Sequence, residues 1–338
     1  MISSAITGAR KYNAPGSDRF GLILFSHGSL LCGAGAALAE HAIRLRQVGG
    51  FAAVEVGYLN YSAPTFERAV QRLSAAEVSR VVVAPFFLVP GYFVTTSLPR
   101  KLAEVGSDYP AMKFMVASCL GSDDRLADAL ISHALAPRPA ARWRDGLWVD
   151  PRTCLIRHDC PVRGTSGCPG TLLTQTPDMS ADQSGSSPDA ECDDSPMLLG
   201  ESEVKSTDAL LVLVHGSPKA EANTVALKIV DGVKRRNVFP IVQAGFLECE
   251  QPSIPDAIKE CIRAGARRIT AIPCFLHVGT HVASDLPNAI DEARATHPDV
   301  EFRMGQYLGM SPLVTDVILD RAREALEDEA ANVAKGSL

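Results

Sequence analysis

The sequence contains two copies of one pattern, and this repeat constrains the fold more than any other feature. The segment LILFSHGS returns as LLVLVHGS, and VVVAPFFLVPGYFVTTSLP returns as ITAIPCFLHVGTHVASDLP. The offset stays at 188 positions, as between His27 and His215. Because chance similarity does not hold one offset over about a hundred residues, the sequence predicts a duplicated module at 20–135 and 207–328.

Each copy alternates short apolar runs with amphipathic stretches, which is typical of strands that alternate with helices. In the second copy the strands are expected at Ala209–Val214, Ile241–Phe246, Arg268–Phe275 and Glu301–Gln306. The helices are expected at Glu221–Arg235, Ile254–Ala264, Ser284–Thr296 and Leu313–Ala325. This order predicts an α/β fold with a small parallel sheet flanked by helices in each module. Ligands bind beyond the carboxyl ends of such strands, so we expect the two modules to face each other across a cleft.

Composition and charge exclude several classes of protein. The net charge of −6 and the pI near 5.8 give no basic field for nucleic acid. No apolar run reaches the roughly 18 residues of a membrane span, and the first residues lack the apolar stretch of a secretory signal. The nine cysteines are scattered and odd in number, which argues against a disulfide framework. We therefore expect a cytoplasmic protein, and a monomer, because one chain supplies both walls of the cleft.

The middle stretch at 136–206 has no counterpart in either copy. Its second half is acidic, polar and almost free of large apolar residues, so we expect disorder there. Its cysteines could hold an iron–sulfur cluster or zinc, although the tight C-x2-C spacing of common clusters is absent. A mobile insertion with free thiols is an equally good interpretation. The candidate cluster ligands are Cys154, Cys160, Cys168 and Cys192.

Three polar residues follow three successive strands of the second copy. Glu248 lies 33 positions after His215, and His281 lies 33 positions after Glu248. Imidazole is the commonest ligand for borderline divalent metals, and a neighbouring carboxylate can accept protons. A lone histidine after a strand is more often an ordinary loop residue, but the set of three indicates metal handling or proton transfer.

The first copy keeps only one residue of this set. His27 matches His215, whereas an asparagine stands at the place of Glu248 and Phe93 stands at the place of His281. We infer a single site, supplied chiefly by the second copy. His27, Tyr92 and Phe93 would form the opposing wall against the substrate, with flat aromatic surface.

Together these motifs resemble the class II tetrapyrrole chelatases, the sirohydrochlorin chelatases of the CbiX and SirB type. The resemblance rests on HGS after the first strand, on FLE after the second, and on P-x-F-L with G-x-H-V-x-x-D-L-P after the third. It implies a lyase that inserts a divalent metal into a planar tetrapyrrole without ATP. It also implies that His215 and His281 bind the metal while Glu248 assists. Two-module members of the family often keep the full set in the first module, and this sequence departs from that by keeping it in the second.

The resemblance and the loop positions add further candidates around the cleft. Lys219 and Ser217 follow the second HGS, where a cation and backbone N–H groups could hold substrate carboxylates. The N–H groups of the turn at Ser29 could do the same in the first copy. His277 is either a third ligand or a rim residue packed against the cleft, and the second interpretation is favoured. Asp285 lies at a predicted helix start, where capping or complementation of the helix dipole is the default role.

The expected reaction is insertion of Co²⁺, Fe²⁺ or Ni²⁺, with cobalt favoured, in cobalamin or sirohaem biosynthesis. The metal is a substrate, and its softness does not separate the three ions at a His/His/Glu site. The alternative is a carrier that binds metal or tetrapyrrole without turnover. A regulatory iron–sulfur protein on the same scaffold is a weaker interpretation that rests only on the middle cysteines.

Overall fold

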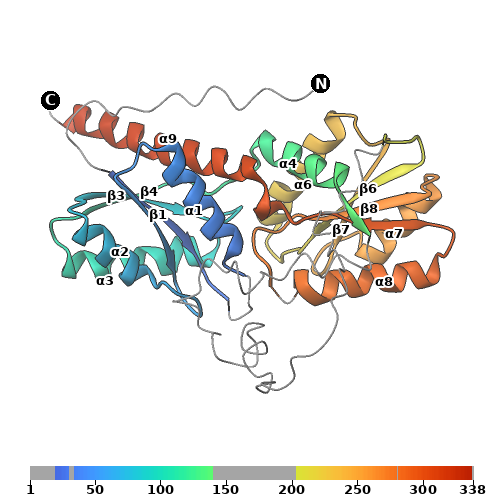
Figure 1. Ribbon diagram of the computed structural model, residues 1–338, viewed down its shortest axis with the longest axis horizontal. Helices are drawn as coiled ribbons and strands as arrows, with labels where there is room; N and C mark the ends of the chain where they lie inside the picture. The colour runs from blue at the N-terminus through green and yellow to red at the C-terminus, as the bar shows by residue number, and fades with distance from the viewer. Residues whose placement is uncertain (1–19, 30–33, 140–202, 280, 337–338) are drawn as a thin grey trace, which may run out of the picture.

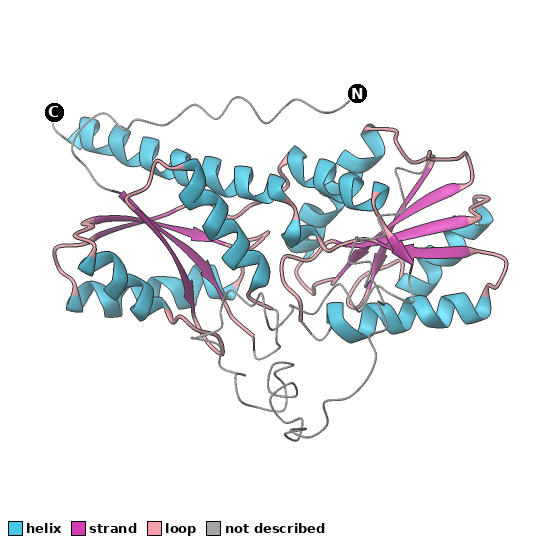
Figure 2. Cartoon of the chain, in the orientation of Figure 1, coloured by secondary structure: helices cyan, strands magenta, loops and turns pink. Residues whose placement is uncertain are grey.

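The computed structural model describes residues 20–29, 34–139, 203–279 and 281–336, and it contains two parallel sheets side by side, each between helices (Figures 1 and 2). The candidate cluster ligands Cys154, Cys160, Cys168 and Cys192, and the stretch expected to be disordered, lie outside these residues. No helix in the described part is long and apolar enough to cross a membrane.

The first copy of the repeat forms a sheet with the strand order β2-β1-β3-β4, in which all neighbours are parallel. Its strands are β1 (Phe20–Ser26), β2 (Ala53–Tyr58), β3 (Arg80–Pro85) and β4 (Lys113–Val116). The connecting helices are α1 (Ala36–Val48), α2 (Phe66–Ala75) and α3 (Leu98–Asp108), preceded by the π-helical turn η1 (Phe93–Ser97). The helix α4 (Asp124–Leu135) follows the last strand.

The second copy repeats this order, with strands in the sequence β9-β8-β6-β7 and the additional strand β5 beside β9. Its parallel strands are β6 (Asp208–Val214), β7 (Ile241–Phe246), β8 (Arg268–Pro273) and β9 (Glu301–Met304). The helices are α6 (Ala220–Arg235), α7 (Ile254–Arg263), α8 (Leu286–Thr296) and α9 (Pro312–Gly336). Two short turns, η4 (His281–Asp285) and η5 (Leu308–Met310), complete it. The predicted α/β fold with two parallel sheets is confirmed.

The central strands are buried on both faces because helices cover each sheet above and below. In β1 the four residues from Leu22 to Phe25 have no exposed surface, and β6 is buried along its whole length. Such continuous apolar runs are what a parallel sheet requires, which explains why these segments lack the alternation of a half-exposed strand.

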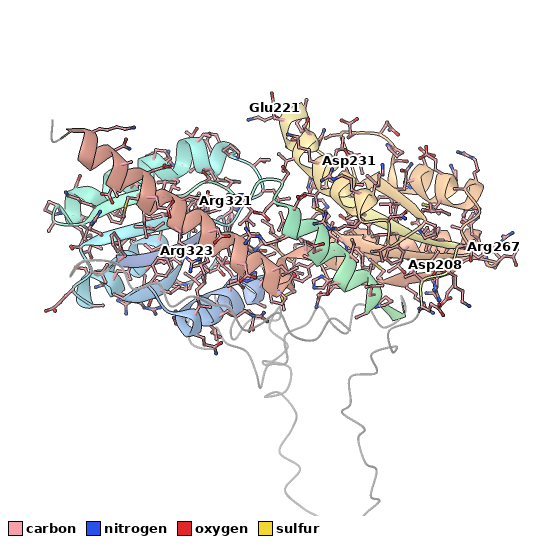
Figure 3. The ribbon with its side chains drawn as sticks, turned by 90° about the horizontal axis from the view of Figure 1, so that it is seen from above. Asp208, Glu221, Asp231, Arg267, Arg321 and Arg323 are labelled. Carbon is pink, nitrogen blue, oxygen red and sulfur yellow. The ribbon has the colours of Figure 1, made fainter. Side chains whose placement is uncertain are left out.

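The last helix of each copy packs mainly on the sheet of the other copy. The helix α9 lies against β3, β4 and α1 of the first module, whereas α4 lies against α6 and β8 of the second (Figures 1 and 3). The strand β5 (Arg138–Pro139), which directly follows α4, pairs antiparallel with β9. Nothing in the repeat itself predicts this exchange, because the pattern of each helix shows only that one face is apolar.

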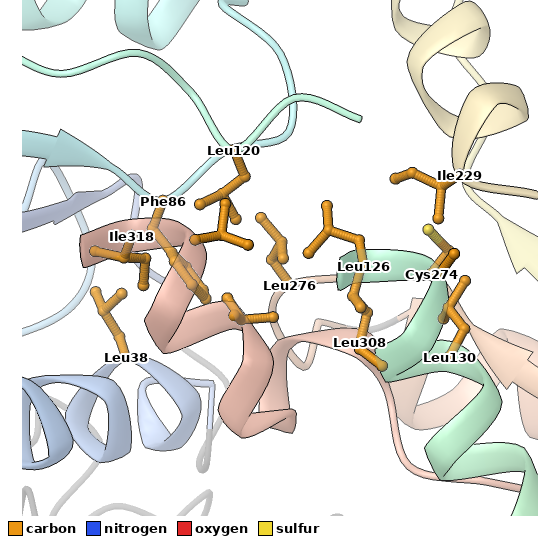
Figure 4. Packing of buried hydrophobic residues seen from close by; sticks show 14 of the residues in the cluster. Leu38, Phe86, Leu120, Leu126, Leu130, Ile229, Cys274, Leu276, Leu308 and Ile318 are labelled. Carbon is orange, nitrogen blue, oxygen red and sulfur yellow. The ribbon is translucent and has the colours of Figure 1, made fainter. Parts of the chain in front are cut away.

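The exchange joins the modules through one continuous hydrophobic core. Leu38, Phe86 and Ile318 pack at the first module, and Leu126 and Ile229 at the second, within the same cluster (Figure 4). Two smaller clusters fill the opposite face of each sheet. The two modules therefore share one core, and the pocket between them has fixed walls.

Ion pairs between the exchanged helices lie over this core. The Arg125 guanidinium of α4 donates to Asp320 of α9 at 2.7 Å, and Arg321 of α9 lies 3.4 Å from Asp123 (Figure 3). Arg80 of β3 donates to Glu329 at 2.5 Å near the far end of α9. These pairs fix how the two helices cross.

Candidate functional site

A pocket of about 330 Å³ lies between the two modules at the carboxyl ends of their strands. This is the place where parallel sheets bind ligands, and the volume is within the usual range of ligand sites. Its walls come from both copies, as expected for a cleft between facing modules. The lining residues on which the argument depends are Ser26, His27, Tyr58, His215, His277 and His281.

A His-Gly turn after the first strand of each copy positions the first histidine. Gly216 has φ of 86°, and a Cβ atom there would lie 1.7 Å from the Glu248 carbonyl oxygen. Only glycine permits both the left-handed backbone and this approach. The Glu248 N–H also donates to the His215 carbonyl at 3.0 Å, so the turn holds these two residues together.

The structure brings the three polar residues of the second copy together. The rings of His215 and His281 are perpendicular, with 4.7 Å between their centroids. The His215 Nδ1 atom lies 3.3 Å from Glu248 Oε1, and it donates to the Gly216 carbonyl at 2.8 Å. All three side chains are about half exposed, so a ligand can reach them.

Asp285 belongs to this group, and of its two predicted roles capping is wrong, whereas complementation of the helix dipole stays a prediction. Its carboxylate makes no capping bond at the start of α8, and instead accepts a hydrogen bond from His281 Nδ1 at 2.7 Å. The turn η4 places the two residues four positions apart on one side. That spacing in a helical segment was the sequence signal for a pair.

Both imidazoles therefore present Nδ1 to an oxygen and keep Nε2 without a hydrogen bond from any described residue. A carboxylate or carbonyl on the second ring nitrogen fixes the tautomer of a metal-binding histidine and raises its basicity. No three histidine, cysteine or acidic side chains in the described part of the chain form a complete metal site. Two imidazoles that leave coordination positions open are suited to holding an ion briefly.

The equivalent place in the first copy is aromatic. The His27 ring packs at a tilt of 38° against Phe93 with 4.1 Å between ring centroids, and Tyr61 packs edge-on to His27 at 5.4 Å. Tyr92 contacts Phe93 at 6.0 Å. Tyr61 and Tyr92 are 57% and 59% exposed, which is unusual for such large rings. The sequence argument missed Tyr61, because its counterpart Cys249 gave no reason to examine it.

His277 lines the pocket and packs against its wall. Its Nε2 atom shares a 2.8 Å hydrogen bond with Ser26 Oγ, and its ring packs edge-on against Phe86 at 4.9 Å. Burial lowers the pKa of His277 to about 4, although hydrogen bonds to the Ala34 and Phe86 carbonyls oppose this shift. A place packed against the cleft is what the favoured interpretation expected, and His277 joins the two modules there as a neutral imidazole.

Other predicted substrate residues lie outside the pocket lining. Lys219 is exposed at the start of α6, and Ser217 bonds the Lys219 N–H at 3.1 Å. In the first copy the Ser29 N–H already donates to Ser62 Oγ at 2.8 Å, so it is not open to a substrate carboxylate. The roles of Ser217, Lys219, Tyr92 and Phe93 in substrate binding stay predictions.

Comparisons with known proteins agree with this architecture. Over 139 residues the chain is 31% identical to the sirohydrochlorin cobaltochelatase of Methanocaldococcus jannaschii, covering 34% of this chain and 97% of that protein. Over 276 residues it is 20% identical to the sirohydrochlorin cobaltochelatase of Priestia megaterium, covering 82% of this chain and 70% of that protein. The structure of SirB from Bacillus subtilis with Fe3+ superposes with a TM-score of 0.63 at 16% identity, covering 92% and 98% of the two chains, which establishes a common fold.

One family model matches the chain twice. The sequence model of the CbiX family matches residues 21–135 and again residues 209–325, which together make up more than half of the chain. The two matches coincide with the two sheets and their flanking helices. This chain therefore belongs to the CbiX family, with two tandem modules.

Proposed function

We propose that this protein is a sirohydrochlorin chelatase that inserts a divalent metal ion into the tetrapyrrole without ATP. Membership of the CbiX family supports this proposal, as do the two relatives named sirohydrochlorin cobaltochelatases. The reaction places it among the lyases of cobalamin or sirohaem biosynthesis.

One observation carries the proposal. The imidazole rings of His215 and His281 lie at the pocket between the modules, with 4.7 Å between their centroids. The Nδ1 atom of His215 lies beside the Glu248 carboxylate, and that of His281 lies beside the Asp285 carboxylate. A structural role does not require two half-exposed histidines supported in this way. A site that receives a metal ion does, because the neutral Nε2 lone pairs remain available.

The groups have distinct roles in the proposed reaction. His215 and His281 hold the incoming metal through Nε2, while the macrocycle lies against the aromatic side of the first copy. The free base loses two pyrrole N–H protons as the metal enters, and the half-exposed Glu248 carboxylate accepts one proton and releases it to solvent before it accepts the second. Because only two protein ligands hold the ion, the four pyrrole nitrogens can displace them.

The aromatic residues of the first copy form the wall against which the ring packs. His27 and Phe93 pack against each other, and the exposed Tyr61 and Tyr92 flank them. Planar rings bind well to such surfaces, since stacking adds to the apolar area that is buried. In this proposal the second module binds the metal, and the first module, which lacks most of the metal-binding groups, binds the ring.

We propose Co²⁺ as the physiological metal, with Fe²⁺ as the competing ion. The relative that covers 82% of the chain is named a cobaltochelatase, and SirB structures have been determined both with Fe3+ and with cobalt. The ligand set does not discriminate strongly between these ions. A competition assay with equal concentrations of both metals under anaerobic conditions tests the assignment, and preferential iron insertion would overturn it.

The test of the activity is turnover. The protein is incubated with sirohydrochlorin and Co²⁺, and the absorbance change is followed beyond one equivalent per chain. His215→Ala and His281→Ala should abolish insertion, whereas Phe93→Ala should only weaken it. Product that stops at one equivalent would instead identify a carrier, and full activity in His281→Ala would refute the assigned site.

A further inference from the structure

The pocket contains polar residues that break the symmetry of the repeat. Besides His281, three of its lining residues carry polar groups where the matching position of the other copy is apolar. The pairs, each separated by 188 positions, are Ser26 with Val214, Tyr58 with Phe246, and His277 with Val89. A residue that served only the shared fold would be free to stay apolar in both copies. The asymmetry therefore points to the ligand.

Two of these polar groups satisfy each other, and the third has no partner. Ser26 and His277 share their 2.8 Å hydrogen bond. Tyr58 is 2% exposed, and its hydroxyl has no hydrogen-bond partner in the described part of the chain. A buried hydroxyl without a partner costs about 1–3 kcal/mol, so its presence in a pocket wall needs a reason.

Tyr58 and Ser26 lie on the same side of the first sheet. They are register partners at the ends of β2 and β1, so their side chains point to one face. That face carries the core shared by both modules, and α1 covers it. The phenol of Tyr58 thus stands between the strand ends and the helix at the inner wall of the pocket.

The start of α1 gives this wall a positive field. Its N-cap is Gly35, which supplies no capping side chain, and its first turn carries no acidic residue. Ala34 lines the pocket, and Ala34 and Ala37 are buried. The matching helix α6 begins instead in solvent, with Glu221 in its first turn. A buried helix start without a cap favours an anion.

We infer that the inner wall of the pocket is a carboxylate subsite, in which the Tyr58 hydroxyl and the N-terminus of α1 receive one carboxylate arm of the tetrapyrrole. This rests on the proposed function, because sirohydrochlorin carries many carboxylates. No lysine or arginine lies among the described lining residues, so the helix dipole and the phenol supply the attraction. The contact fixes which edge of the macrocycle enters first.

The test measures binding without metal, so that it does not depend on turnover. Quenching of intrinsic fluorescence gives the Kd of the full-length protein for sirohydrochlorin and for a derivative whose carboxylates are converted to primary amides. Tyr58→Phe should weaken binding of the acid about ten-fold, the lower end for a hydrogen bond to a charged group. Its effect on the amide should be at most two-fold. Acetate at millimolar concentration serves as a third ligand, to separate a subsite for the attached arm from one for any free carboxylate.

Tyr307→Phe is the matched control. Tyr307 is also 2% exposed, and burial, followed by charge repulsion from the neighbouring Tyr58, raises its pKa, but Tyr307 does not line the pocket. Loss of its hydroxyl should leave both Kd values unchanged. Thermal unfolding of Tyr58→Phe without ligand should occur at the same temperature as wild type or higher, because an unpaired hydroxyl has been removed.

The outcomes separate the two proposals. Equal weakening of acid and amide by Tyr58→Phe would overturn the carboxylate subsite, as would unchanged binding of the acid. If acetate binds the wild-type protein as tightly as sirohydrochlorin does, recognition of the attached arm would be overturned. A wild-type protein that binds sirohydrochlorin but never turns it over would refute the proposed chelatase activity and leave the subsite intact.

Discussion

The glycine of the second His-Gly turn offers the sharpest test of which module carries the chemistry. In Gly216→Ala the new Cβ atom would lie 1.7 Å from the Glu248 carbonyl oxygen, whereas such atoms do not approach closer than 3.0 Å. The loop that carries Glu248 must therefore move by at least 1.3 Å. The same loop positions the Glu248 carboxylate beside His215, so this movement would displace the carboxylate from the proposed metal site.

The cost to stability follows from the same geometry. An alanine at φ of 86° pays about 1–2 kcal/mol for its left-handed backbone, and the displaced loop adds to this. We expect the free energy of unfolding to fall by about 2–4 kcal/mol in total. A displacement near 1 Å in a catalytic group can lower the rate about 100-fold, and we expect a loss of that size in kcat.

Gly28→Ala is the matched control, because the repeat supplies the same turn in the first module. Gly28 has φ of 91°, and its Cβ would lie 1.9 Å from the Asn60 carbonyl oxygen, so the loss of stability should be nearly equal. Its kcat should fall by no more than about ten-fold, since the displaced residue is an amide. Urea unfolding and initial rates of cobalt insertion measure both quantities. Equal loss of kcat in the two variants would refute the assignment of the chemistry to the second module.

Three further changes test the site and the fold. Asp285→Asn removes the carboxylate that accepts from His281, so the apparent affinity for Co²⁺ should fall about 10- to 100-fold in initial-rate titrations, and an unchanged affinity would exclude the pair from metal binding. His41 is buried, and burial lowers its pKa to about 4 from 6.5, so the unfolded chain takes up a proton first as the pH falls from 7 to 4. That uptake should cost about 3 kcal/mol of stability, and chemical unfolding should show a shallower pH dependence in His41→Gln, whereas an identical slope would contradict it. Leu326→Ala on α9 should lower the stability of both modules by about 2–4 kcal/mol in one calorimetric transition, and two separate transitions would contradict a shared core.

Much of the site was predictable because the repeat places equivalent residues at equivalent strand ends. The carboxyl ends of parallel strands meet at one edge, so the positions of His215, Glu248 and His281 implied that they would converge. Each of the three residues follows its own strand, and the spacing of 33 residues is the length of one strand–helix unit. The aromatic replacement at Phe93 could likewise be read by alignment of the two copies.

Other parts of the site depended on contacts between the copies and had no local signal. His277 looked like a rim residue, yet it bonds Ser26, which is 251 positions away. Asp285 looked like a cap because an acid at a helix start is usually one, and only the π-helical turn η4 revealed its contact with His281. Tyr58 and Tyr61 lie in segments that match the repeat well, so the sequence did not indicate that either residue belongs to the site.

The sequence by itself determined the two α/β modules, the succession of strands and helices along each module, and the histidines at the strand ends, because these follow from periodicity and from the repeat. Only the tertiary structure decided that α4 and α9 change places, that one core joins the modules, and which polar groups meet in the pocket. The reason is physical. An apolar helix face specifies that it must be buried but not by which sheet, and a polar side chain specifies that it needs a partner but not which one.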